Sequence, residues 1–68
     1  MVILPGIPEC GATDGKNVFA GFADGVILKI EENGTISTVG KLPGAIRILH
    51  WRNGRILAGD AAGNVAIW

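Results

Sequence analysis

The sequence repeats itself at a displacement of 38 residues, and this repeat constrains the fold more than any other feature. The tripeptide Leu-Pro-Gly at 4–6 recurs at 42–44, and the same ungapped register carries residues 18–25 onto 56–63. Seven of the 27 positions aligned in this register are identical. One register that serves both halves predicts two copies of a single structural unit.

Each unit consists of short aliphatic and β-branched runs between turn residues, and no window is long enough for an amphipathic helix. The pairs Asp24-Gly25, Asn33-Gly34 and Asn53-Gly54 suit the two central positions of a type I′ hairpin turn, where both φ angles are positive. Consecutive strands should therefore be antiparallel neighbours. We expect strands at about 7–12, 17–22, 26–31 and 35–40 in the first unit, and at about 45–51, 55–60 and 64–68 in the second.

The run Val18-Phe19-Ala20-Gly21-Phe22 is apolar on both faces of its expected strand, so both faces need to be covered. A four-stranded meander of about 38 residues that repeats is typical of a propeller blade, which lies between two others. The fold class is therefore predicted to be all-β, with one domain of two tandem blades at about 5–42 and 43–68. Small residues at 20, 21, 58 and 59 would let adjacent sheets approach closely.

Residues 53–68 resemble the second half of a WD40 repeat, with Trp68 at the place of the signature tryptophan. In the first unit Asp24-Gly25 matches the turn aspartate of that family. The sequence departs from the family pattern at Ala62 and Ile30, which replace the aspartate and the tryptophan, and it lacks the Gly-His pair. Quinoprotein-like blades, with a similar Gly-x-x-Asp-Gly turn, are the near alternative. Either resemblance implies a β-propeller.

Two blades are too few to close a propeller, which has ~4 to 8 of them. The second unit ends before its fourth strand, whereas residues 1–4 align with the end of a fourth strand at 39–42. We expect these residues to complete the second blade of a neighbouring subunit, in a head-to-tail contact that closes a ring. A homotrimer with six blades is the first expectation and a homotetramer with eight the next. The inter-subunit strand is predicted to involve Val2, Ile3, Leu4 and Trp68.

Composition favours such assembly and argues against several other partners. A domain near 68 residues buries only ~60% of the surface that its unfolded chain exposes. With one cysteine and one histidine, oligomerisation is the remaining means of stabilisation. Six basic and six acidic side chains are scattered, so we expect no nucleic acid partner. No signal peptide or long apolar run is recognisable, which predicts a soluble, cytoplasmic protein without a membrane partner.

Four residues on the inner strands are candidates for assembly or binding. Glu9 and Arg47 occupy equivalent positions, so around a ring they would either form a polar collar at the channel or pair and fix the order of the blades. His50 and Trp51 precede the Asn53-Gly54 turn. Trp51 could stack on a flat ligand such as a sugar ring, or it could be a packing residue between blades.

Asp60 and Asn64, together with Asp24, are candidate rim contacts at the second hairpin turn of each unit. Asp and Asn in turns ordinarily serve turn geometry, and these residues are too sparse for a calcium loop. Cys10 aligns with an apolar position and is expected to be a small buried hydrophobe.

No catalytic set, phosphate-binding glycine loop or paired metal ligands are recognisable, so we expect no enzyme activity, cofactor or metal. The function expected from these observations is a non-catalytic propeller scaffold that forms a ring and binds a protein or carbohydrate on one rim. The alternative is a purely structural, self-assembling propeller fragment, natural or engineered, without a ligand of its own.

Overall fold

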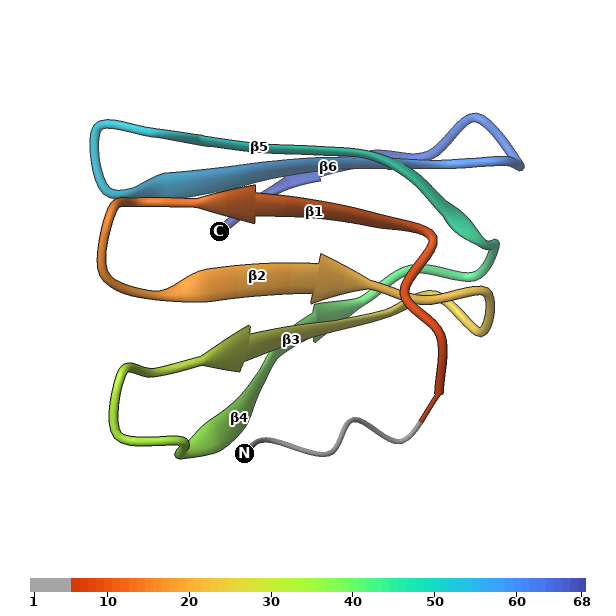
Figure 1. Cartoon of the computed structure of the whole chain (residues 1–68). Helices are drawn as coiled ribbons and strands as arrows, with labels where there is room; N and C mark the ends of the chain where they lie inside the picture. Colours follow the sequence, from red (N-terminus) through yellow and green to blue (C-terminus); the bar gives the residue numbers. More distant parts are fainter. Residues whose placement is uncertain (1–5) are drawn as a thin grey trace.

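A computed structural model describes residues 6–68, which form two antiparallel sheets and contain no helix (Figure 1). The all-β expectation is confirmed. Sheet A has four strands in the order β1-β2-β3-β4, and sheet B has three in the order β5-β6-β7. The strands are β1 (Cys10–Thr13), β2 (Val18–Gly21), β3 (Val26–Ile30), β4 (Ile36–Lys41), β5 (Ile46–Arg52), β6 (Arg55–Asp60) and β7 (Val65–Ile67).

The strand positions agree with the sequence prediction except at the first strand. It was expected from residue 7, but β1 begins at Cys10. Pro8 has no amide hydrogen and cannot donate to a ladder, so regular pairing begins after it. The amide of Glu9 still donates to the Gly21 carbonyl, at 2.7 Å. The predicted inter-subunit residues Val2, Ile3 and Leu4 lie outside the described residues.

Only one of the three expected type I′ turns has that conformation. The Asn53-Gly54 pair has positive φ at both positions, 50° and 77°. Asp24 and Asn33 do not have positive φ, and that part of the prediction was wrong. Their loops are three-residue hairpin connections, in which a tight turn is followed by a left-handed glycine. The left-handed glycines of these loops and of the equivalent β6–β7 loop are Gly25, Gly34 and Gly63.

The two sheets pack face to face around a core to which both contribute. Its buried residues are Ile27 of β3, Leu42, Ile46 of β5 and Ala58 of β6. A Cβ atom at Gly21 would overlap the side chain of Ile46, so glycine is what allows β2 and β5 to approach so closely. The expectation that Gly21 permits close approach of the sheets is confirmed.

A second close approach lies toward the outer strands. The indole of Trp68 lies against Gly40 of β4, where a Cβ atom would overlap the ring. The backbone of Trp68 exchanges two hydrogen bonds with Ile56, at 2.8 and 2.9 Å, and this pairing holds the indole over β4. The ring of Trp68 thus occupies the space that a side chain at position 40 would otherwise fill.

A substitution at Gly21 tests the first of these contacts. Gly21→Ala should lower the free energy of unfolding by about 1–3 kcal/mol because Ile46 must move. Ile46→Ala should cost about 2–5 kcal/mol through its cavity, and the double variant should cost less than the sum. Urea denaturation at one protein concentration measures all three.

Gly6→Ala is the matched control, because a Cβ atom there would lie 4.0 Å from its nearest neighbour, Phe22. Its free energy of unfolding should stay within about 0.5 kcal/mol of the wild-type value. Additive costs in the double variant would mean that Gly21 and Ile46 do not constrain each other.

Candidate functional site

Each sheet has a second face that does not pack against the other sheet. On sheet B this outer face, called the B face, exposes Ile48, Val65 and Ile67, with exposed fractions of 60%, 71% and 60%. Successive side chains of a strand point to opposite faces, so every second residue of these strands lies on the same face. The B face comprises Ile48, His50, Arg52, Arg55, Leu57, Val65 and Ile67.

The outer face of sheet A, called the A face, is also apolar. Ala20, Phe22 and Leu28 form a buried cluster there, separate from the core between the sheets, and Val26 and Ile30 pack against it. Val18 stands at the end of this face and is 49% exposed. The A face is therefore apolar and largely buried, whereas the B face exposes apolar side chains beside three basic ones. An exposed apolar patch with a polar rim is typical of an interaction surface.

The repeat relates the B face to residues that are already buried. Adding 38 to Ile27, which is fully buried between the sheets, gives Val65, which is 71% exposed. The same addition turns Phe19 into Leu57 and Cys10 into Ile48. Sheet B therefore presents outward the face that sheet A buries against its partner sheet.

The converse holds for the A face. Subtracting 38 from the residues by which sheet B contacts sheet A gives outward residues of sheet A. Ala58 of the common core becomes Ala20, and Trp68 becomes Ile30. By the repeat, the B face corresponds to the face of sheet A that packs on sheet B. In the same way, the A face corresponds to the face of sheet B that packs on sheet A.

A cleft of about 330 Å³ lies between the sheets at the end where the β1–β2 and β5–β6 turns meet. Trp51 and Trp68 line it together with Phe19, Lys29 and Asp14. The structure therefore brings together two tryptophans that the sequence analysis had assigned to different roles. Two indoles and two charged groups could hold a flat polar ligand by stacking.

The carboxylate of Asp14 is held at the edge of this cleft by its own turn. It accepts hydrogen bonds from the amides of Lys16 at 2.9 Å and Asn17 at 2.6 Å, and from the Asn17 side chain at 3.2 Å. The Asn17 and Lys16 backbone amides keep the pKa of Asp14 below its usual value. Asp14 is therefore ionised at neutral pH.

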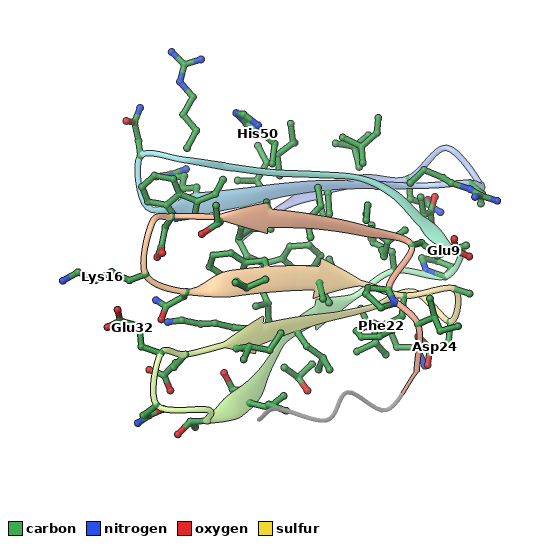
Figure 2. All side chains as sticks on the ribbon, in the orientation of Figure 1. Glu9, Lys16, Phe22, Asp24, Glu32 and His50 are labelled. Atoms are coloured by element: carbon green, nitrogen blue, oxygen red, sulfur yellow. The ribbon has the colours of Figure 1, made fainter. Side chains whose placement is uncertain are left out.

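His50, expected to act beside Trp51, lies on the opposite face of sheet B. Figure 2 shows its ring projecting away from sheet A. It lines a shallow hollow of about 360 Å³ with Arg52, Arg55, Leu57 and Ile67. Successive residues of a strand point to opposite faces, which is why neighbours in sequence are separated here.

Asp60 and Asn64 lie at the other end of sheet B from Trp51. The buried Asp60 carboxylate accepts four hydrogen bonds from its own chain. One oxygen binds the Gly44 amide at 2.8 Å and the Asn64 side-chain amide at 3.0 Å. The other binds the amides of Ala62 at 3.1 Å and Asn64 at 2.8 Å. The carboxylate thus ties the β6–β7 turn to the segment that connects the sheets.

These bonds lower the pKa of Asp60. The Asn64 side-chain amide has the largest effect, and the backbone amides of Asn64, Gly44 and Ala62 add to it, while burial opposes them. The sequence analysis offered Asp60 as a ligand contact and missed this connection to Gly44. The spacing of an aspartate four residues before an asparagine around a tight turn was an available signal for the bonds within the turn, but not for the bond from Gly44.

Glu9 and Arg47 are both exposed, Glu9 just before β1 and Arg47 in β5 beside it. Arg47 occupies an irregular step in the pairing of β5 with β6. Their pairing around a ring stays a prediction. Cys10 is half-buried, and its Sγ lies 3.7 Å from the Ile46 carbonyl. Burial, helped by the charge of Glu9, raises the pKa of this thiol.

No family model matches the chain, and searches among curated proteins and solved structures find no match either. Within residues 6–68, no three His, Cys, Asp or Glu side chains are close enough to hold a metal ion. In the same part of the chain, no helix is long and apolar enough to cross a membrane.

Acid should destabilise the fold through Asp60. Because its pKa is lowered on folding, its contribution to stability is complete above the unfolded value of about 3.9 and is lost as the pH falls through the folded value. Asp60→Asn should lower stability at pH 7 and flatten the loss below pH 4. Asn64→Ala should flatten it partly, because it removes the strongest donor.

Urea midpoints between pH 7 and pH 3 measure this effect. Asn33→Ala is the matched control, since Asn33 also bonds within a turn, to the Thr35 amide, but has no contact with Asp60. It should keep the wild-type dependence on pH. An unchanged acid slope in Asp60→Asn would contradict the assigned role.

Proposed function

We propose that this chain is a non-catalytic scaffold that assembles head to tail with copies of itself into a closed β-propeller, two blades per chain. The observation that carries the proposal is the contrast between Ile27 and Val65. These residues are equivalent in the repeat, yet one is fully buried and the other 71% exposed. A second copy would bury Val65 as sheet B buries Ile27.

The docking would repeat a contact that each chain already contains. The B face of one copy would lie on the A face of the next, and apolar surface such as Ile48 and Ile67 would leave water at about 25 cal/mol per Å². Each added copy presents a further B face, so growth ends only when the ring closes. Three copies with six blades are our first choice, and four copies with eight the next.

The blade type proposed is WD40-like, with quinoprotein-like blades as the near alternative. The repeat length, the β-meander and the position of Trp68 directly after β7 support this assignment. In the simplest version the chain is purely structural and has no ligand of its own.

Polar substitutions on the B face test the proposal. Replacing Val65 and Ile67 by glutamine should raise the chain concentration needed for half-assembly about a hundredfold, because roughly 3 kcal/mol of apolar burial is lost. Light scattering over a range of concentrations measures the molar mass. Wild type should reach three or four chain masses.

The matched control is Ala62→Gln, an exposed turn position of the same sheet. It should assemble like wild type. A wild-type chain that remains a folded monomer at high concentration would overturn the proposed function.

A second candidate function is the binding of a carbohydrate in the cleft of Trp51 and Trp68, with Asp14 and Lys29 as hydrogen-bonding groups. The gathering of two indoles and two charged groups around one cleft favours this reading. Aromatic faces stack on sugar rings, and charged rims bind hydroxyl groups. A protein segment would be the other possible occupant.

A glycan array probed with the assembled protein tests this candidate. A bound glycan should change tryptophan fluorescence saturably, and Trp51→Ala should weaken binding by at least tenfold while Trp51→Phe keeps part of it. Circular dichroism controls for folding. If every glycan that binds wild type binds Trp51→Ala equally well, the cleft is not the site.

A further inference from the structure

The two sheets carry opposite net charges. Residues 6–41 contain five carboxylates and three lysines, a balance of −2, whereas residues 42–68 contain three arginines and one carboxylate, a balance of +2. In the head-to-tail ring every contact joins a sheet A to a sheet B. Opposite charges therefore meet at every boundary and attract the correct faces.

The positive charge of sheet B is concentrated on its outer face. Arg52 and Arg55 are direct partners across the β5–β6 pair, and both are exposed. They line the hollow with His50, and no carboxylate is among the described residues that line it. Like charges directly opposite each other in a sheet are unfavourable. Since no carboxylate of residues 6–68 lines the hollow, a carboxylate from a second copy would relieve this repulsion.

The repeat indicates which group of a second copy would reach this hollow. Within the chain, Trp68 of sheet B lines the cleft beside Asp14, Phe19 and Lys29 of sheet A. Adding 38 to those three residues gives Arg52, Leu57 and Ile67, which line the hollow on the B face. Subtracting 38 from Trp68 gives Ile30, so Ile30 of the next copy would stand beside them.

Two carboxylates follow Ile30 directly. Glu31 and Glu32 form the β3–β4 turn, at the same end of the molecule as the β5–β6 turn (Figure 1). Figure 2 shows Glu32 at that end, where Lys16 also lies. Glu31, Glu32 and Lys16 line one shallow depression with two asparagines, and its net charge is negative.

We propose that Arg52 and Arg55 of one copy pair with Glu31 and Glu32 of the next copy, and that this pairing directs the docking of the B face on the A face. The proposal rests on the proposed function and adds the polar contact that gives the assembly its direction. Such exposed pairs are screened by salt, so association should slow as ionic strength rises, while the apolar contact persists.

Charge reversal tests the pairing. Variant one carries Arg52→Glu and Arg55→Glu, and variant two carries Glu31→Arg and Glu32→Arg. Each alone should need at least a tenfold higher concentration for half-assembly, because like charges now meet. The fourfold variant that carries all these changes should assemble like wild type, since the pairs are restored in reverse. Lys41→Glu, an exposed change in β4, is the control and should leave assembly unchanged.

An equal mixture of the two variants gives a sharper readout. The B face of each variant is complementary only to the A face of the other variant, so neighbouring chains must alternate, and native mass spectrometry should find both variants in equal numbers. A four-chain ring can then close with two chains of each variant. A three-chain ring cannot close, and should give open pairs with one chain of each variant. Circular dichroism confirms that each variant is folded before mixing.

The outcomes separate this inference from the proposed function. If wild type assembles and both variants assemble equally well, the pairing is wrong and the ring stands. If the variants fail but neither the mixture nor the fourfold variant recovers, the pairing is also wrong. A wild-type monomer at every concentration overturns both proposals.

Discussion

The structure depends on the close approach of two sheets at positions where sheet A lacks side chains. Gly21 admits Ile46, and Gly40 admits Trp68, so the larger residues of sheet B enter gaps in sheet A. Neither sheet could form this core alone, because Ile27 comes from sheet A, Ile46 and Ala58 come from sheet B, and Leu42 comes from the segment between them. The fold is therefore a property of the pair rather than of either unit.

The two units share a backbone but differ in chemistry. Phe22 of the first unit and Asp60 of the second are equivalent in the repeat. Phe22 makes an apolar contact on the A face, whereas the Asp60 carboxylate anchors the connection between the sheets. Asp14 similarly corresponds to Arg52. These differences would make successive boundaries of a ring chemically distinct, with an aromatic cleft at one and a basic hollow at the next.

Much of the fold could be predicted from the sequence because strands and turns are encoded locally. The 38-residue repeat and the glycine-containing turns placed all seven strands, and β6 matches its predicted bounds. The type of turn was less predictable, since Asp24 and Asn33 fit two loop geometries and the choice depends on which position the glycine takes. The separation of His50 from Trp51 followed from strand alternation and could have been foreseen. Three of the four hydrogen bonds of Asp60 lie within its own turn and could also have been foreseen, but the fourth could not, because it comes from Gly44, 16 residues away.

The connection between β4 and β5 has a further consequence for assembly. Residues 42–45 are the only covalent link between the sheets, and they hold the two contacting faces at an effective concentration in the millimolar range or above. In the proposed ring the same kind of contact must also form between separate chains, without this link. One contact type would then exist in two kinetic classes, a permanent one within each chain and a reversible one between chains. The ring could exchange subunits while every blade pair stays intact.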